Sequence, residues 1–199
     1  MQLEHLGARP RIHPTAVVAS TAVISGDVTI GADCQVLHGA VITSEGGAIT
    51  LGENVIVMEN ALIRATATNP VHIGDHVLVG PMASVSGALI EDEVFLATGT
   101  RVFNGARIGA RSEVRINAVV HLRTTLAPET TVPIGWVAVG EPAQLLSPDR
   151  HEEIWAAQRE LDFPGYVFGL DRDTPDLMVQ LTERYGRSLA RHAGDRQIE

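Results

Sequence analysis

Residues 12–42 read IHPTAVVASTAVISGDVTIGADCQVLHGAVI and carry an aliphatic side chain at every sixth position. A period of six fits neither an α-helix, which repeats every 3.6 residues, nor a half-buried strand, which repeats every two. Hexapeptide periods are typical of β-helix solenoids, in which each hexad forms one short strand and one turn. The period extends far beyond this stretch, through Ile12, Val18, Ile24, Ile30, Val36, Ile42, Leu51, Val57, Ile63, Ile73, Val79, Val85, Ile90, Leu96, Val102, Ile108, Val114, Val120 and Leu126.

A small or β-branched residue stands four positions after each aliphatic residue, as at Ala22, Val28, Cys34 and Ala40. The chain is 45% hydrophobic but only 4% aromatic, which suits a narrow core of stacked aliphatic side chains. We therefore predict an all-β solenoid, a parallel β-helix whose coils each contact only their neighbours.

If three hexads close one coil, the repeating aliphatic residues fall into three columns that begin at Ile12, Val18 and Ile24. All three interruptions of the period follow a residue of the third column, namely Ile42, Ile63 and Val85. We therefore expect loops over residues 43–50 and 64–72 to leave the same corner of successive coils. Loops held at one place on a rigid scaffold often carry function.

The hexad pattern ends after Leu126, and we predict a β-helix over residues 1–146 followed by a C-terminal α-helical extension over residues 147–199. In that extension Ser147 or Asp149 can cap a helix that runs to about Leu161.

Residues 162–173 read as a turn-rich link with three aromatic residues, Phe163, Tyr166 and Phe168, that look exposed. Thr174 followed by Pro175 predicts the start of a second helix that runs to about residue 191. This helix carries an apolar stripe that needs a partner, either the solenoid flank or a neighbouring subunit, at positions Leu177, Leu181, Tyr185 and Leu189.

The net charge of −9 and the absence of lysine argue against nucleic acid or an anionic membrane as a partner. The N-terminus has no apolar signal segment and no stretch is long enough to span a membrane, so we expect a cytoplasmic protein. Cys34 is the only cysteine and occupies a small repeat position, which predicts a buried, inert thiol.

Residues 55–90 read VIVMENALIRATATNPVHIGDHVLVGPMASVSGALI, and they resemble the metal-site region of the γ-class carbonic anhydrases. Residues 12–42 are similar to its opening coils, and residues 137–146, VAVGEPAQLL, to its closing segment. The resemblance covers roughly residues 10–160 and implies a left-handed β-helix that assembles as a homotrimer with sites between subunits.

The chain departs from that family at the metal ligands. Where the family has its three histidine ligands, this chain has Arg64, Pro81 and Ser86. Zinc needs nitrogen, sulfur or oxygen donors, which arginine and proline cannot supply, so we predict no metal at this location and no zinc carbonic anhydrase activity.

Two columns of side chains would face each other across the subunit boundary that the resemblance implies. One column contains His38, Glu59 and Pro81, and the other contains Thr43, Arg64 and Ser86. Our hypothesis makes His38, oriented by Glu59, a catalytic group for proton transfer. The predicted ligand-binding residues are Arg64, which would hold a carboxylate or phosphate oxygen, together with Thr43, Glu45, Met58, Pro81 and Ser86. The alternative is that Glu59 and Arg64 only form an intersubunit salt bridge.

Three functions remain open at this point. The trimer binds or transforms a small anionic or carbonyl-containing molecule in the intersubunit cleft without metal; or it is a coenzyme A-dependent acyltransferase; or it is a non-catalytic assembly subunit. An enzyme of this sequence would use metal-independent acid–base or acyl-transfer chemistry. The first function requires no cofactor, whereas the second requires coenzyme A. Its phosphates could contact five arginines of the last coils, which otherwise form a solvated face: Arg101, Arg107, Arg111, Arg115 and Arg123. The sequence assigns no role to the histidines near the termini or on helix surfaces, His5, His13, His151 and His192.

Overall fold

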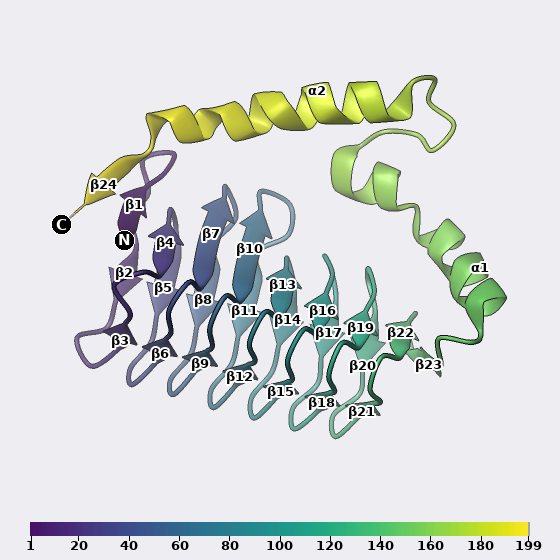
Figure 1. Cartoon of the computed structure of the whole chain (residues 1–199), viewed down its shortest axis with the longest axis horizontal. Helices are drawn as coiled ribbons and strands as arrows, with labels where there is room; N and C mark the ends of the chain where they lie inside the picture. Colours follow the sequence, from purple (N-terminus) through teal and green to yellow (C-terminus); the bar gives the residue numbers. More distant parts are fainter. Residues whose placement is uncertain (199) are drawn as a thin grey trace.

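A computed structural model describes residues 1–198 and shows a parallel β-helix of three sheets (Figure 1). The first sheet contains β2 (Arg11–Ile12), β5 (Val28–Ile30), β8 (Ile49–Leu51), β11 (Val71–Ile73), β14 (Leu89–Ile90), β17 (Arg107–Ile108) and β20 (Thr125–Leu126). The second contains β3 (Val17–Val18), β6 (Gln35–Val36), β9 (Ile56–Val57), β12 (Leu78–Val79), β15 (Phe95–Leu96), β18 (Glu113–Val114) and β21 (Thr131–Val132).

The third sheet is the largest and ends in antiparallel strands at both edges. It contains β1 (Gln2–Glu4), β4 (Val23–Ser25), β7 (Val41–Glu45), β10 (Leu62–Thr66), β13 (Ser84–Ser86), β16 (Arg101–Val102), β19 (Val119–Val120), β22 (Val137–Val139), β23 (Gln144–Leu146) and β24 (Arg196–Ile198). The edge pairs β22–β23 and β1–β24 are antiparallel, and the other pairs are parallel.

The strand register confirms the three predicted columns. In the first sheet Ile12 pairs with Ile30 and Ile30 with Leu51, and the column continues to Leu126. In the third sheet Ile63 pairs with Ile42 and with Val85. Side chains of these columns and the small residues between them form one continuous core along the solenoid axis. Cys34 is fully buried there, and this burial raises the pKa of its thiol.

Most turns between hexads place one residue in the left-handed backbone region, three positions after the repeating aliphatic residue. Asn54, Asn60 and Asn117 stand at such positions with φ values of 55°, 58° and 56°, and Gly39 and Gly99 occupy others. Asparagine and glycine tolerate this conformation better than other residues. The hexad therefore consists of an inward aliphatic residue, a left-handed turn residue and a small corner residue.

The predicted loops over residues 43–50 and 64–72 are mostly strands, so their expected boundaries were wrong. β7 and β10 continue past the usual hexad and pair with each other as far as Glu45 and Thr66. The chain then reverses in short turns, one of them closed by mutual backbone hydrogen bonds between Thr66 and Asn69. The inserted residues extend the ladder because this satisfies their backbone donors and acceptors.

The C-terminal extension forms α1 (His151–Leu161), a π-helical turn (Pro164–Phe168), α2 (Leu177–Leu189) and a 3-10 turn (Ala190–Gly194). We call residues 162–194 the C-terminal arm. Figure 1 shows that α1 leaves the last coil and that α2 returns along the solenoid to the N-terminal coil, where β24 joins β1. The proposed division of the chain after residue 146 stays a prediction.

Both predicted helix starts differ from the structure. Ser147 accepts a turn hydrogen bond from the Arg150 amide through its backbone carbonyl, and α1 begins without a side-chain cap. The Thr174 amide donates to the Asp171 carbonyl in a preceding turn, and α2 starts after Asp176 instead. In both places a tight turn precedes the helix, and the helix begins after that turn.

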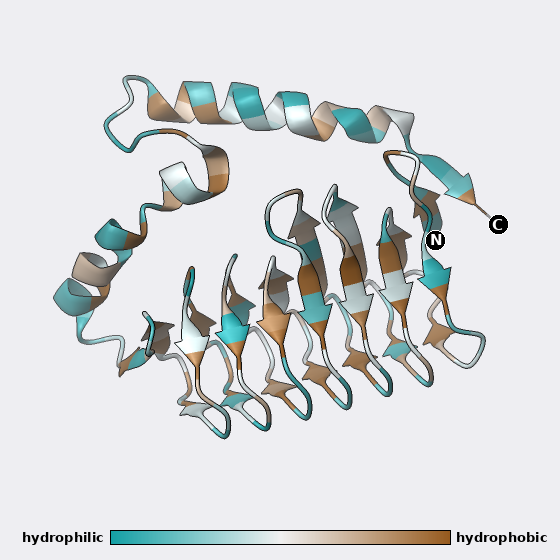
Figure 2. Ribbon diagram, turned by 180° about the vertical axis from the view of Figure 1, so that it is seen from behind, coloured by the Kyte–Doolittle hydropathy of each residue, from teal (hydrophilic) through white to brown (hydrophobic). Residues whose placement is uncertain are grey.

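The apolar stripe of α2 meets the rest of the chain at Tyr185, which contacts Arg64 of β10 and Phe168 of the π-helical turn. Leu177, Leu181, Tyr185 and Leu189 are all half-buried, and α2 alternates between hydrophobic and hydrophilic turns in Figure 2. Among residues 1–198, no helix is long and apolar enough to cross a membrane.

Candidate functional site

A cavity of about 730 Å³ lies between the C-terminal arm and the ends of the strands of the third sheet. Its solenoid side includes Glu45 from β7, Arg64 from β10 and Ser86 from β13. Its arm side includes Tyr166 and Phe168 of the π-helical turn. The extension of β7 and β10 therefore creates the wall on which the arm closes.

Arg64 extends from the solenoid into this cavity. On the ladder it pairs with Thr43 on one side and Ser86 on the other, as the predicted column requires. Its Nη1 donates a hydrogen bond of 3.1 Å to the Tyr185 hydroxyl of α2. Its Nε is buried and has no hydrogen-bond partner within residues 1–198. The guanidinium thus keeps donor capacity that the described chain does not use.

The cavity carries an excess of positive charge, although the chain as a whole has a net charge of −9. Arg64, Arg184 and Arg191 line it, and none of them forms an ion pair with the described residues. Glu45, the carboxylate in the lining, accepts hydrogen bonds from His192 Nε2 at 3.0 and 3.1 Å. Three arginines thus surround one carboxylate that is already hydrogen-bonded to His192, and this charge balance favours an anionic ligand.

Aromatic side chains form the rest of the wall and hold the arm in place. The rings of Phe168 and Tyr185 lie edge to face with centroids 5.5 Å apart, and Phe163 contacts Phe168 in the same way at 5.7 Å. The Tyr166 hydroxyl donates to Asn69 of the solenoid at 2.8 Å, and Arg123 lies 5.1 Å above the Tyr166 ring. The three aromatic residues of the link, which the sequence suggested to be exposed, all line the cavity. Phe163 is exposed as expected, at 37%, whereas Tyr166 and Phe168 are half-buried.

The structure brings together only part of the predicted site. Glu45, Arg64 and Ser86 line the cavity, and the buried Thr43 donates to Glu45 at 3.3 Å. The remaining predicted residues lie at the turns between the second and third sheets, outside the cavity lining; they are His38, Met58, Glu59 and Pro81.

His38 is exposed, and its Nδ1 lies 2.8 Å from the Thr21 hydroxyl. Within residues 1–198 no hydrogen bond joins it to Glu59. Whether His38 and Glu59 face Arg64 of a neighbouring subunit is a property of the assembly, so this part of the site stays a prediction.

Sequence reasoning missed Tyr185, Arg184 and Arg191, which come from α2 and the turn after it. The available signal was the apolar stripe of α2, since a tyrosine within such a stripe places its hydroxyl against whatever surface the stripe covers. Nothing in the hexad pattern indicated which part of the solenoid that surface would be.

The late arginines are largely engaged within the chain. Arg111 pairs with Glu129 and Arg115 with Glu113, while Arg101 donates to backbone carbonyls. Arg123 donates to the Leu161 carbonyl besides stacking on Tyr166. Arg107 is exposed. This arrangement favours the solvated-face interpretation over a preformed cluster for phosphates.

His121 joins the solenoid to α1 near one end of the cavity. Its ring stacks on Phe103 with centroids 5.4 Å apart, and its Nδ1 accepts a hydrogen bond of 2.8 Å from the Leu122 amide. Its Nε2 lies 3.0 Å from the Gln158 side-chain amide of α1. Burial lowers the pKa of His121, and a proton on Nδ1 would also displace the Leu122 amide.

These contacts predict acid-sensitive anchoring of α1. The folded pKa lies below the ordinary value of 6.5, so below pH 6.5 the unfolded state binds a proton that the folded state rejects. This contribution to stability is complete above pH 6.5 and decreases as the pH falls toward the folded pKa. Between pH 7 and pH 5, we expect the urea midpoint of unfolding to fall less in His121→Gln than in wild type. His13→Gln, at an exposed position, is the control. Parallel pH profiles for wild type and His121→Gln would contradict this role.

The fold is that of a hexapeptide-repeat β-solenoid protein. Comparison with known proteins shows which members of this class the chain resembles. No protein-family profile matches the chain. Gamma carbonic anhydrase 1, mitochondrial, of Arabidopsis thaliana is 29% identical over 151 residues, which are 73% of this chain and 53% of that protein. A carbonic anhydrase of Geobacillus kaustophilus is 24% identical over 153 residues, 77% of this chain and 81% of that protein.

Among solved structures, a hexapeptide transferase family protein from Anaplasma phagocytophilum superposes with a TM-score of 0.53 at 23% identity, covering 79% of this chain and 90% of that one. This likeness shows the fold. The chain spans about half the length of the Arabidopsis relative. The chain is a γ-carbonic-anhydrase-like hexapeptide-repeat protein.

Proposed function

We propose that this protein binds a small carboxylate- or phosphate-bearing molecule with an apolar body in the cavity under the C-terminal arm. The observation that carries the proposal is the set of three arginines without ion pairs among the described residues, Arg64, Arg184 and Arg191, around an aromatic cavity of about 730 Å³. Sites for small molecules have this size and this combination of apolar walls with a few polar anchors.

Arg64 is the proposed anchor, because its guanidinium is planar and presents parallel donors that match the two oxygens of a carboxylate. Tyr185 fixes its direction by accepting a hydrogen bond from Nη1. The aromatic rings of Phe168 and Tyr185 would contact the apolar part of the ligand. The arm, which belongs to the same chain, then acts as the cover of the site.

Zinc has no part in this proposal. The positions that correspond to the zinc ligands of γ-class carbonic anhydrases carry Arg64, Pro81 and Ser86. A cationic guanidinium and a proline ring offer no donor to Zn²⁺, and a lone serine hydroxyl does not make a zinc site. This donor set does not fit the metal, and no step of the chemistry is routed through it.

The proposal includes a homotrimer in which His38 and Glu59 of a neighbouring subunit approach Arg64, with Met58 and Pro81 at the rim. Because Nδ1 of His38 lies at the Thr21 hydroxyl, Nε2 is the nitrogen left for a ligand. In that arrangement His38 would move a proton on a molecule that Arg64 holds. Without a trimer, the cavity remains a binding site of one chain and His38 has no role in it.

The test is a panel of ligands in thermal unfolding, since a ligand of the native state raises stability by RT ln(1+[L]/Kd). Benzoate and phenyl phosphate should raise the melting temperature, whereas benzamide, which has the same ring without a charge, should not. Equal responses to benzoate and benzamide, or no response to either, would remove the proposal.

Two further measurements separate the alternatives. A response to acetyl-CoA alone would favour the acyltransferase, and a trimer that responds to none of these probes would favour an assembly subunit. Analytical ultracentrifugation reports whether the particle has three times the chain mass of 21.3 kDa. A monomer would rule out the contribution of His38 and Glu59 but leave the arginine-lined cavity in place.

A further inference from the structure

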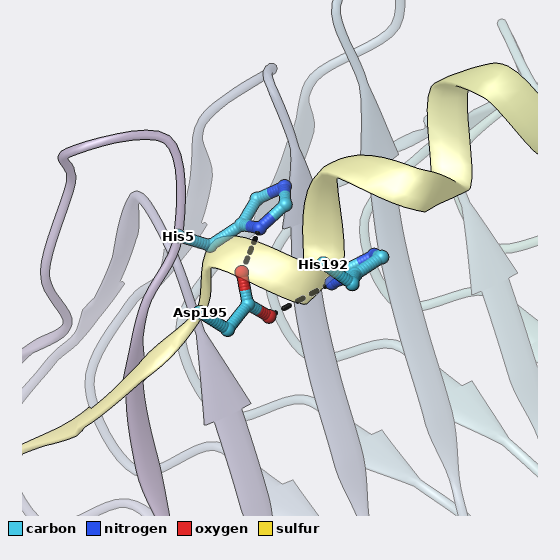
Figure 3. A group of neighbouring side chains, drawn as sticks. All are labelled: His5, His192 and Asp195. Atoms are coloured by element: carbon cyan, nitrogen blue, oxygen red, sulfur yellow. Dashed lines mark hydrogen bonds and ion pairs between the residues drawn. The ribbon is translucent and has the colours of Figure 1, made fainter.

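The two ends of the chain meet at a group of three side chains that the hexad pattern does not explain (Figure 3). His5 follows β1, His192 lies at the end of the C-terminal arm, and Asp195 lies directly after the arm, before β24. One Asp195 oxygen is 2.5 Å from His5 Nδ1, and the other is 2.8 Å from His192 Nδ1. The ligand atoms of all three residues lie within 4.8 Å of one another.

Both imidazoles present the same nitrogen to this group. Their rings are stacked with centroids 4.3 Å apart and an angle of 21° between planes, so the two Nδ1 atoms point toward one carboxylate. His5 is buried, with 2% of its surface exposed, and its Nε2 has no hydrogen-bond partner among residues 1–198. Nδ1 is therefore the ring nitrogen by which His5 contacts the group.

Glu45 gives His192 the environment of a metal ligand. Its two carboxylate oxygens lie 3.0 and 3.1 Å from His192 Nε2, so Nε2 carries the proton and donates it to Glu45. Nδ1, which donates to Asp195 in the metal-free chain, would lose its proton when an ion binds and would then present its lone pair to the ion. A carboxylate behind the far nitrogen of a histidine is the usual support of histidine ligands in metal sites.

The charge around the group also suits a dication. Glu45 and Asp195 contribute two carboxylates, whereas Glu4, the other acidic residue nearby on β1, is engaged by Arg9 and Arg196. Two imidazole nitrogens and a carboxylate oxygen are a donor set that Zn²⁺ accepts, with a fourth position left for water.

We propose that His5, His192 and Asp195 form a binding site for a divalent transition metal ion of the Zn²⁺ type. The site adjoins the arginine-lined cavity through Glu45, which lines that cavity and bonds to His192, and it does not include the residues at the position of the family's zinc. The ion would replace the two Asp195 hydrogen bonds and join β1 to β24, which already pair from Gln2 and Ile198 to Glu4 and Arg196. It would thereby fasten the C-terminal arm over the cavity.

The test uses the full chain, freed of metal with EDTA and dialysed at pH 8, because imidazole ligands bind a metal in their neutral form and release protons on binding. We expect isothermal titration with Zn²⁺ to give one site per chain. Saturation at 100 times Kd should raise the melting temperature by about 5–10 °C. Co²⁺ should give visible absorption bands of a four-coordinate ion, which hydrogen-bonded histidines alone would not produce.

Conservative variants keep the result interpretable if alanine variants fail to fold. Asp195→Asn keeps the shape of the side chain and should abolish stoichiometric binding, and His5→Gln should do the same. Glu45→Gln removes only the support of His192 and should weaken binding about 10- to 100-fold. His151→Gln, at an exposed position on α1, is the matched control and should bind as wild type does.

Two results would overturn the site. One is a wild-type chain that takes up no Zn²⁺ at the single-site level and shows no thermal shift. The other is stoichiometric binding that persists in both Asp195→Asn and His5→Gln, which would place the ion elsewhere. Neither result bears on the binding of benzoate or phenyl phosphate at Arg64, so the two proposals can fail independently.

Discussion

Arg64→Gln is expected to weaken the binding of benzoate or phenyl phosphate about 10- to 100-fold. Hydrogen bonds to charged groups contribute roughly 1.5–3 kcal/mol, and glutamine cannot present parallel donors to both oxygens of a carboxylate. The Nε of Arg64 is buried and has no hydrogen-bond partner in the described chain, so it is available to a bound anion. The measurement is isothermal titration with each anion.

Two companion variants show whether charge or geometry is responsible. Arg64→Lys keeps the charge but loses the planar fork, and we expect it to bind more weakly than wild type and more tightly than Arg64→Gln. Arg111→Gln removes an exposed arginine that pairs with Glu129 on the solenoid surface and should leave binding unchanged. If Arg64→Gln binds both anions as wild type does, Arg64 is a structural partner of Tyr185 and the ligand site lies elsewhere.

Ile63→Ala is expected to lower the free energy of unfolding by about 2–5 kcal/mol, the range for truncation of a buried aliphatic side chain. Ile63 is fully buried and stands in the column between Ile42 and Val85. Neighbouring coils are held by that ladder and cannot collapse into the space. For a chain of this length the loss corresponds to a fall of roughly 5–15 °C in melting temperature.

The matched control for this variant is Ile56→Ala on β9. Ile56 belongs to the same repeat but faces outward and is 36% exposed. Its truncation should change the urea midpoint by much less than that of Ile63. Equal effects of the two substitutions would mean that inward and outward positions had been assigned to the wrong faces.

The solenoid could be predicted from the sequence because its information is local. Each hexad carries its own inward aliphatic residue and corner residue, and each coil contacts only its neighbours, so a period of six is enough to place Ile30 beside Ile12 and Leu51. For the same reason the column of Thr43, Arg64 and Ser86 was predicted before the structure placed them on adjacent strands.

The cover of the site could not be predicted in the same way. Tyr185 meets Arg64 across 121 residues of sequence, and no repeat relates the two positions. The helix stripe showed that α2 needs a surface, but its direction depends on the tight turns near Asp171 and Asp176, which also shifted the predicted helix start. Tyr166 and Phe168 looked exposed because their partners, Asn69 of the solenoid and Tyr185 of α2, lie outside the link.

The sequence by itself determined the coil, its three faces and the arginine that projects from the third face, because those features repeat along the chain at short range. Only the tertiary structure decided that the arm closes over Arg64 and that His5 meets His192 and Asp195. The physical reason is that a contact between the two chain ends, 190 residues apart for His5 and Asp195, arises from the path of the whole backbone and leaves no periodic trace.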